Sequence, residues 1–344
     1  MKLEDIFTFK NLYQAHKECR KSKQQKGEVI RFEVNLGVNI VNMMNEIIAK
    51  KYELGGYRKF VVFEPKERLI EAPPYKDRIL IRCFCDICLK PKIESKLIYD
   101  NAACRKEKGT SFAIHRLESF LKKEYFTCKN NEFYFLKCDI RKYFPSINHR
   151  ILQELLKEIG FSEDEMWMIN KLISSESSYQ TVGLPLGNQS SQWFALLYLN
   201  KVDHFIKEHL RIKYYIRYMD DMILIHSDKE YLRYCLKEIE NLCSTKLHLS
   251  LNSKTQIGKV KNGIDFLGYC HYLTTTGKIV RKLRNSSRVR LKRHLKTLAK
   301  LENKGLVDEK YVYTRKNAYH NHIKNTSESS RLKWEVIPNF CQKK

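Results

Sequence analysis

The stretch that decides the fold is Ile216-Arg217-Tyr218-Met219-Asp220-Asp221-Met222-Ile223-Leu224-Ile225. Two acids stand between two apolar runs, Tyr214–Tyr218 and Met222–Ile225, and this pattern predicts a β-hairpin with both carboxylates at its tip. An Asp pair can simply favour a turn. These arms, however, are too apolar for the surface, so we expect a buried hairpin whose tip opens into a cleft. Adjacent carboxylates there repel each other, and a divalent cation that prefers oxygen ligands, such as Mg²⁺, relieves the repulsion.

The composition indicates a globular protein with a polyanionic partner. The 344 residues suffice for two or three subdomains and contain 64 Lys and Arg against 39 Asp and Glu, a net charge of +25. Such an excess destabilises a compact chain unless a polyanion is bound, and nucleic acid is the first expectation. An anionic membrane is the alternative, but no apolar run approaches 18 residues and the charged start is not a signal peptide. We therefore expect a cytoplasmic protein without membrane contact.

The 11 cysteines lie mostly inside apolar runs, which is typical of reduced, buried thiols in a cytosolic protein. Cys83, Cys85 and Cys88 cluster, so a zinc site competes here with core packing. No second pair stands at zinc-ligand spacing, and core packing is the favoured interpretation.

A basic hairpin is predicted in the N-terminal part, after a mainly helical region of about 60 residues. Tyr57–Phe63 and Arg68–Ala72 have strand composition and are joined by a turn at 64–67. Lys66 and Arg68 lie at or just after this turn. They either coat a solvated hairpin or clamp a phosphate, for which Arg offers forked hydrogen bonds.

A third acid, Asp139, ends the predicted strand Phe133–Ile140. An Asp at a strand end can cap the following segment. It can also meet the Asp220 and Asp221 tip, where carboxylates could hold two metal ions about 3.5–4 Å apart for phosphoryl transfer.

A turn rich in glycine, Gly183-Leu184-Pro185-Leu186-Gly187-Asn188-Gln189, precedes an apolar helix. Glycine permits a ligand to approach the backbone closely, and small polar residues can cap the helix or face a base and sugar. Other periodic segments predict a strand at Leu247–Asn252 and helices at Asp77–Leu89 (ended by Pro91), Ile151–Gly160, Glu163–Ser174, Ser191–Leu210 and Glu230–Thr245.

The segment from Lys278 onward is strongly basic above an apolar stripe of Leu291, Leu295 and Leu298. This pattern fits a solvated helix face. The charge density makes a helix that grips a nucleic-acid duplex the better interpretation.

Together these motifs resemble a reverse transcriptase. Tyr218-Met219-Asp220-Asp221, the upstream Asp139 followed by Phe144, and the glycine-rich turn come in the order of that family's palm. Phe266-Leu267-Gly268-Tyr269 resembles its primer grip. The resemblance covers about residues 57–272 and implies an α+β, right-hand polymerase fold. Its expected domains are an N-terminal region with fingers (1–132), a palm whose antiparallel sheet carries the acids (133–280) and a basic helical thumb (281–344).

The resemblance also implies roles for individual residues. Asp139 and Asp220 would bind two Mg²⁺ ions, with the Ile140 carbonyl as a further ligand and Asp221 in support. Lys254 is either a general acid for the pyrophosphate or a plain surface lysine. Phe144 would exclude the ribose 2′-hydroxyl, so that dNTPs are selected, unless it is a core residue. The remaining contacts to the nucleotide are expected from Lys66, Arg68, Leu186, Gly187, Asn188 and Gln189.

The subtype rests on Gly187–Gln192. Many bacterial and intron-encoded reverse transcriptases end this segment Ser-Pro, with Gln before the Gly, whereas this chain has Gln192 and Leu186. That pattern resembles diversity-generating retroelement enzymes, in which the residues matching Leu186 and Arg68 are implicated in errors opposite template adenines. Such enzymes use a dedicated template RNA, form an RNA–DNA duplex and work with a pentameric accessory variability protein.

Other classes compete with this subtype. Antiviral defence reverse transcriptases that copy a non-coding RNA share the palm. A retron enzyme is disfavoured because Asn101-Ala102-Ala103-Cys104-Arg105 lacks the expected His, and a group II intron protein because no maturase or endonuclease segment follows the expected thumb. The intact acid triad disfavours an inactive RNA-binding protein.

Overall fold

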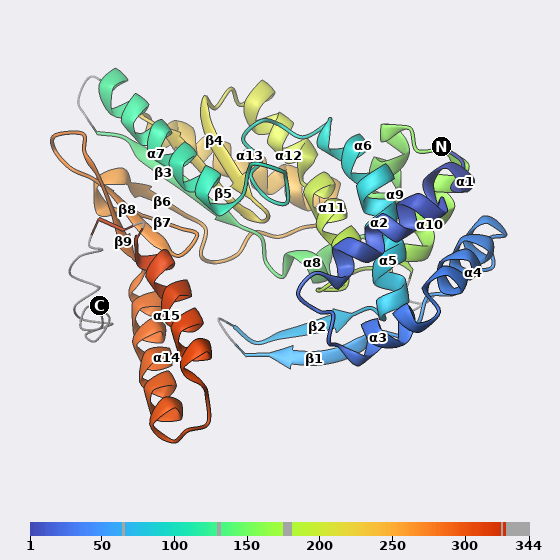
Figure 1. The fold of residues 1–344 in the computed structure, drawn as a ribbon. Coiled ribbons are helices and arrows are strands. Elements are labelled where there is room, and N and C mark those ends of the chain that lie inside the picture. The colour runs from blue at the N-terminus through green and yellow to red at the C-terminus, as the bar shows by residue number, and fades with distance from the viewer. Residues whose placement is uncertain (64–65, 129–131, 175–180, 325, 328–344) are drawn as a thin grey trace.

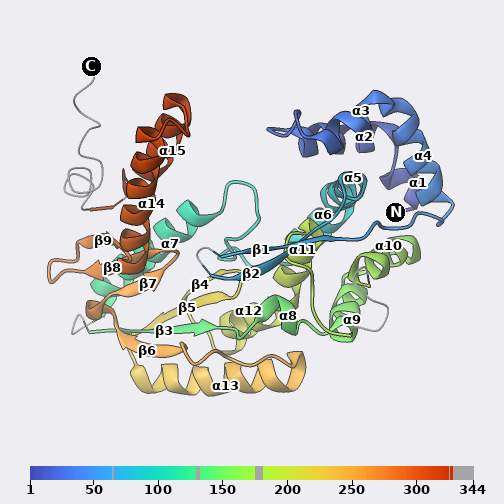
Figure 2. The same cartoon turned by 90° about the horizontal axis from the view of Figure 1, so that it is seen from below.

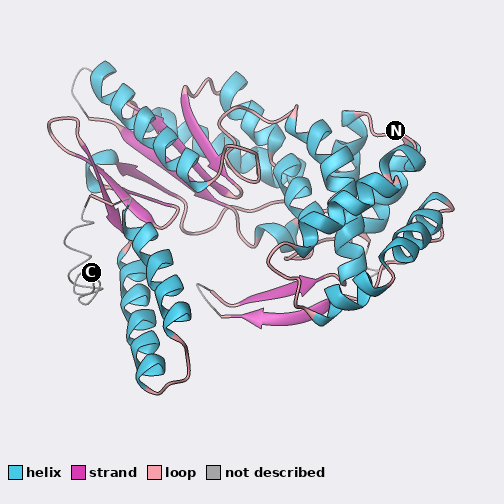
Figure 3. Ribbon diagram, viewed as in Figure 1, coloured by secondary structure: helices cyan, strands magenta, loops and turns pink. Residues whose placement is uncertain are grey.

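The acidic hairpin forms as predicted in a computed structural model, which describes residues 1–63, 66–128, 132–174, 181–324 and 326–327. Strands β4 (Tyr214–Tyr218) and β5 (Asp221–His226) pair antiparallel. They belong to a four-stranded sheet with the order β4-β5-β3-β6, completed by β3 (Tyr134–Asp139) and β6 (Gln256–Lys259). Helices and antiparallel strands are mixed throughout (Figure 3), so the expected α+β class is confirmed.

Alternation along the strands divides the sheet into two apolar faces. Side chains such as Leu136 and Leu224 pack toward α13 (Lys229–Leu247), which lies under the sheet in Figure 2. Side chains such as Phe135 and Ile223 pack with α7 (Thr110–Thr127) on the other face. Because alternate residues share a face, Lys137, Asp139 and Asp221 fall on the α7 side of the sheet.

A second body of helices packs beyond the acid-bearing end of this sheet (Figure 1). The described helices there are α1 (Leu3–Ile6), α2 (Phe9–Arg20), α3 (Gly27–Val34), α4 (Leu36–Ile48), α5 (Tyr75–Phe84), α6 (Lys90–Glu94), α8 (Tyr143–Ser146), α9 (His149–Ile159), α10 (Glu163–Ile173) and α11 (Gln189–Tyr198). The apolar faces of these helices and the face of the sheet that packs on α13 form one continuous core.

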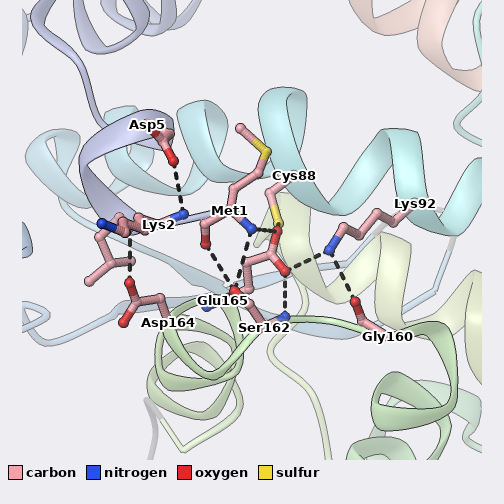
Figure 4. Close-up of polar contacts among 10 residues, drawn as sticks. Met1, Lys2, Asp5, Cys88, Lys92, Gly160, Ser162, Asp164 and Glu165 are labelled. Atoms are coloured by element: carbon pink, nitrogen blue, oxygen red, sulfur yellow. Dashed lines mark hydrogen bonds and ion pairs between the residues drawn. The ribbon is translucent and has the colours of Figure 1, made fainter.

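The three clustered cysteines belong to this core. Cys83, Cys85 and Cys88 are buried, and Cys88 Sγ donates to Glu165 Oε1 at 3.3 Å (Figure 4). None of them takes part in a set of metal ligands among the residues that the structure covers. Their burial agrees with the core-packing interpretation.

Glu165 is the buried acid that joins three segments of this core. Its carboxylate accepts hydrogen bonds from Lys92 Nζ at 2.6 Å, from the Ser162 backbone at 2.6 Å and from the Met1 amino group at 3.2 Å (Figure 4). Burial alone would raise the pKa of Glu165, but these donors lower that pKa to about 2.

Three helix and strand predictions were wrong in detail. Pro91 does not end its helix, because it falls in the first turn of α6, directly after a π-helical turn at Cys85–Leu89 where the hydrogen-bond register changes. The helix predicted at Ser191–Leu210 is divided into α11, α12 (Asn200–His204) and a π-helical turn, Phe205–His209. Instead of a strand at Leu247–Asn252, α13 continues to Leu247, and only Leu251 bridges to a strand end.

The basic hairpin consists of β1 (Arg58–Val62) and β2 (Arg68–Ala72), with residues 64–65 of its turn outside the described part. In Figures 1 and 2 it extends from the helical body toward α14. Most of its side chains are exposed. A two-stranded ribbon of this kind is marginal alone, so its attachments to the body decide its position.

A third sheet leads into the basic helices. Strands β7 (Ile264–Phe266), β8 (Tyr269–Leu273) and β9 (Ile279–Leu283) precede α14 (Asn285–Asn303) and α15 (Glu309–Lys324). The apolar stripe on α14 packs as expected, with Leu291 and Leu298 buried. The proposed boundary at 280 falls inside β9, and the three domain ranges remain predictions. No helix in the described part is long and apolar enough to span a bilayer.

Candidate active site

Strand pairing brings the three acids to one end of the sheet. Asp139 is the direct partner of Asp221 across β3 and β5, although 82 positions separate them in the sequence. Tyr218 pairs with Asp221, which leaves Met219 and Asp220 as a two-residue loop. Met219 has a φ of 56° while Asp220 keeps a negative φ, a combination found in type II′ hairpin turns. A side chain in this region costs about 1–2 kcal/mol, so the turn is held by its surroundings.

Burial and mutual repulsion disfavour three ionised carboxylates at the tip of the β4–β5 hairpin. Burial raises the pKa of Asp220, and the charge of Asp139 adds to the effect. Burial also raises the pKa of Asp221 to about 6; Lys137 opposes the rise, while Asp220 and Asp139 increase it. The nearby cationic side chains therefore offset burial and mutual repulsion of the acids only in part.

Lys137 is a site residue that the sequence analysis missed. Its Nζ lies 3.2 Å from Asp221 Oδ1 and donates to the Asp265 carbonyl at 2.7 Å. Its position two residues before Asp139 puts it on the same face of β3, and this alternation was the available signal. Lys137 thus gives Asp221 a counterion of its own.

The donor set fits a divalent cation. Within the described ranges, no three His, Cys, Asp or Glu side chains are already gathered around one point. Asp221 Oδ1 is nevertheless buried without a well-aligned hydrogen bond, and burial raises the pKa values of both Asp220 and Asp221. Carboxylate oxygens short of positive charge suit a hard cation. The Ile140 carbonyl remains available as a further oxygen, because the bridge to Leu251 is made through its neighbours.

A second residue missed by the sequence analysis lies beneath the turn. Arg217 is fully buried, and its Nη1 donates to the Met219 carbonyl at 2.9 Å. Its ion pair with Asp203, on α12, has an Nη2–Oδ2 distance of 2.7 Å. A charged residue inside an apolar strand was the available signal, since a buried Arg requires a partner.

The glycine-rich turn packs against the basic hairpin. The Leu186 carbonyl accepts a hydrogen bond from the Glu71 backbone of β2 at 2.7 Å. Gly187 has a φ of 124°, and a Cβ there would lie 2.9 Å from the Glu71 carbonyl oxygen. Glycine is therefore required both by the backbone conformation and by the close approach to β2.

Asn188 is buried and acts as the cap of α11. Its Oδ1 accepts from the Ser190 backbone at 3.0 Å and from the Ser190 hydroxyl at 2.9 Å. Its Nδ2 donates to the Tyr57 hydroxyl at 3.0 Å, which links the cap to the segment leading into β1. Gln189, the first residue of α11, is half-buried.

The structure brings some of the other predicted residues to this region. Arg68 is exposed on β2, and its positive charge acts on Asp220 by lowering the pKa of that carboxyl against the larger effect of burial. Lys66 is exposed just before β2. Phe144 is half-buried on α8, and its carbonyl accepts from the Leu184 backbone at 3.0 Å, so it adjoins the glycine-rich turn.

Lys254 lies on an exposed turn beside Asp139. The Thr255 hydroxyl in this turn accepts from the Asp139 backbone at 3.5 Å, and the Lys254 backbone donates to Asn252 Oδ1 at 3.2 Å. This position is compatible with a general acid for the pyrophosphate and with a plain surface lysine.

Comparison with known proteins identifies a family for this chain. A family model described as "Reverse transcriptase (RNA-dependent DNA polymerase)" matches residues 66–271. The putative COX1/OXI3 intron 2 protein of Saccharomyces cerevisiae is 21% identical over 336 residues, which is 72% of this chain and 36% of that protein. The chain thus spans about a third of this relative. An apo telomerase from Candida tropicalis, truncated from the C-terminal domain, has a TM-score of 0.50 at 15% identity, covering 70% of this chain and 59% of that one.

A second telomerase structure from Candida tropicalis, with a fragment of telomeric RNA, gives a TM-score of 0.50 at 14% identity over 75% of this chain and 51% of that one. This likeness confirms the expected right-hand polymerase fold. These relatives are an intron protein and telomerases, so the diversity-generating subtype is a matter for proposal. The family model covers most of the chain, including all three acids, and the chain belongs to the reverse transcriptase family.

Proposed function

We propose that this chain is an RNA-directed DNA polymerase that makes cDNA by two-metal nucleotidyl transfer. The observation that carries the proposal is the pairing of Asp139 with Asp221, with Asp220 in the adjoining turn. Burial raises the pKa of Asp220 and of Asp221, and a bound divalent cation would favour the ionised form of both carboxylates. Membership of the reverse transcriptase family supports the same chemistry.

Asp139 and Asp220 would hold two Mg²⁺ ions, with the Ile140 carbonyl as an additional ligand. When bound, such ions lower the pKa of the primer 3′-hydroxyl and neutralise the triphosphate. Asp221 supports the other two acids, because Lys137 already balances its charge. Lys254 is the candidate proton donor to the pyrophosphate, since its turn adjoins Asp139.

The basic hairpin would bind the triphosphate of a dNTP. Arg68 already acts electrostatically on Asp220, so an anion between the two would meet Arg68 on one side and the cations held by the acids on the other. Lys66, just before the same strand, adds a second positive charge. This arrangement neutralises the triphosphate from both sides of the site.

The glycine-rich turn and Phe144 would line the nucleotide pocket. The ring of Phe144 occupies the space that a ribose 2′-hydroxyl needs, which selects dNTPs. Gly187 would let the backbone approach the nucleotide, and Gln189, the first residue of α11, would face the base and sugar. Asn188 would hold the turn in place and would not contact the nucleotide itself, because its side chain caps α11 and bonds to Tyr57.

The RNA template and the RNA–DNA duplex would lie against α14. This helix carries Arg288, Arg290, Lys292, Arg293, Lys296 and Lys300 above its buried leucines. Contacts of this kind are made to the phosphate backbone and do not read sequence.

We further propose that the enzyme is error-prone at template adenines and serves a diversity-generating retroelement with a pentameric accessory variability protein. The apolar Leu186, held against β2, gives up a polar contact near the nascent base pair, so geometry is checked less strictly there. The alternative is an antiviral defence enzyme that copies a dedicated non-coding RNA.

The test is to sequence the cDNA made by the purified protein with Mg²⁺, dNTPs and a primed RNA of mixed sequence. Asp220→Asn serves as the inactive variant, and Asp164→Asn, on α10 away from the acid cluster, is the matched control. We expect cDNA that depends on Asp220 and carries errors opposite adenines. Absence of Asp220-dependent cDNA would overturn the polymerase proposal, and faithful or repetitive cDNA would favour the defence alternative.

A further inference from the structure

Arg217 has the largest side chain among the fully buried residues that the structure describes, and its guanidinium is engaged on three sides. Nε and Nη2 each lie 2.7 Å from an oxygen of Asp203, in a forked ion pair. Nη2 also donates to the Leu196 carbonyl at 2.9 Å, and Nη1 to the Met219 carbonyl at 2.9 Å. A buried charge is tolerated only with such complete pairing.

Asp203 is itself oriented from several elements. It accepts from the Tyr215 hydroxyl at 2.6 Å and from Asn101 Nδ2 at 3.4 Å, in addition to Arg217. The Arg217 backbone is fixed as well, because its N–H donates to the Asp100 carbonyl at 3.1 Å and its carbonyl accepts from the Ala102 backbone at 2.9 Å. The guanidinium therefore has one available position.

The three acceptors of Arg217 belong to different functional parts. Met219 is the turn residue directly before Asp220, and it has the left-handed φ of 56°. Leu196 is in α11, the helix that follows the glycine-rich turn, while Asp203 is in α12. One planar group therefore holds the acid-bearing turn at a fixed position relative to the helix of the nucleotide pocket. An apolar side chain could fill the same volume but could not donate to the Met219 carbonyl.

We propose that Arg217, oriented by Asp203, is a positioning residue that holds the Met219–Asp220 turn beside the paired Asp139 and Asp221, and thereby sets the affinity of the site for divalent cations. The proposal rests on the proposed polymerase function. It differs from a purely structural role, because it requires a change in metal dependence as well as in stability.

The test uses Arg217→Met combined with Asp203→Leu, which removes both charges and keeps the core apolar, so that neither partner is left buried and unpaired. Arg217→Lys is the conservative variant; it keeps the charge but lacks the fork that reaches all three acceptors. Lys92→Met combined with Glu165→Gln is the matched control, since it removes another ion pair, partly buried and in the helical body.

Single-nucleotide addition on a primed RNA is measured at increasing Mg²⁺, and Mn²⁺ binding to the protein alone is measured by electron paramagnetic resonance. For the Arg217/Asp203 double variant we expect at least a tenfold weaker apparent affinity for both ions, with the rate largely restored by excess Mg²⁺. Arg217→Lys should fall between the wild type and this variant. The control should lose thermal stability and keep the wild-type metal dependence.

Unaltered Mg²⁺ and Mn²⁺ dependence in the Arg217/Asp203 variant, with only a lower melting temperature, would show a structural role and overturn the inference alone. If the double variant does not fold, Arg217→Lys decides by the same two measurements. A wild-type protein that binds Mn²⁺ but adds no nucleotide would sink the polymerase proposal, while the Mn²⁺ comparison would still decide the role of Arg217. A wild type that binds no Mn²⁺ would overturn both.

Discussion

Lys137 and Asp221 form an ion pair inside the acid cluster, with 3.2 Å between Nζ and Oδ1. Lys137 comes from β3, the strand that also ends in Asp139, and Asp221 opens the neighbouring strand. Lys137 therefore neutralises Asp221, whereas Asp139 and Asp220 are the two acids to which the proposed function assigns the metal ions.

Replacing Lys137 by Met should make activity more sensitive to low pH. Asp221 has a raised pKa of about 6, which Lys137 keeps from rising further. Without Lys137 that pKa rises toward neutrality, so more of the cluster is protonated and cations bind less well at pH 6.5 than at pH 8.5. A rise of one unit corresponds to about tenfold in the proton equilibrium. The measurement is the pH–rate profile at limiting Mg²⁺, with Lys259→Met, at a half-buried lysine of β6, as control. A parallel loss at all pH values would contradict the assignment.

Gly187→Ala should loosen the joint between the basic hairpin and the palm. The new Cβ would sit 2.9 Å from the Glu71 carbonyl oxygen and would require a φ of 124°. We expect a loss of about 2 kcal/mol in the free energy of unfolding and a higher KM for dNTPs. Gly56→Ala is the matched control, because its Cβ would meet nothing within 4 Å. Equal melting temperatures and KM values for the two variants would refute the close-approach argument.

Phe144→Ala should admit ribonucleotides. Removing the ring frees the space for a 2′-hydroxyl, and discrimination against rNTPs should fall on the order of 10–100-fold. The ratio of kcat/KM for dNTP and rNTP incorporation is the readout. Phe126, which is 77% exposed, provides the control substitution to Ala. An unchanged ratio would show that Phe144 is a core residue and does not exclude the ribose 2′-hydroxyl.

Leu186→Gln should lower the error rate opposite template adenines. A polar side chain at this position restores a contact near the nascent pair, while the backbone bond to Glu71 is kept. Sequencing of cDNA from a template with all four bases compares adenine-directed errors with errors elsewhere. A uniform change at every template base, or no change, would show that Leu186 does not cause errors directed at template adenines.

Acid should destabilise the protein through its buried carboxylates. Glu165 has a pKa lowered to about 2, since donors such as Lys92 outweigh burial; the same holds for Glu118 beside Arg281 and His271. A lowered pKa stabilises the fold above the unfolded value near 4.5, and this stability is lost as pH falls from about 4.5 to 2. Each group contributes up to about 3 kcal/mol. Urea unfolding between pH 3 and 7 should show a shallower acid decline for Glu165→Gln; an identical slope would refute this.

Strand patterns and motif order predicted much of the palm from sequence. The apolar runs around Asp220 and Asp221 predicted the hairpin, and the strand before Asp139 predicted the third acid, because alternation and turn chemistry are local properties. The residues that balance and position these acids were missed. Lys137 meets Asp221, and Arg217 meets the carbonyl of Leu196, only after distant segments pack, and no local pattern encodes that contact.

The errors in helix and strand bounds have similar physical causes. A proline normally ends a helix because it lacks the backbone N–H. At Pro91 the preceding π-helical turn changes the hydrogen-bond register, so the helix continues as α6. The alternating Leu247–Asn252 segment suggested a strand, yet His248 adopts a left-handed conformation that ends α13 and turns the chain away. Tertiary packing overrode local preference at both places.

The joint between β2 and the glycine-rich turn has a mechanical consequence. The Glu71–Leu186 backbone bond and the Asn188–Tyr57 bond attach the basic hairpin to the same turn that lines the nucleotide pocket. A tilt of the hairpin therefore moves the glycine-rich turn with it. Under the proposed function, binding of the triphosphate and tolerance of a mismatched base would be coupled through this joint, and a substitution at the joint would alter both together.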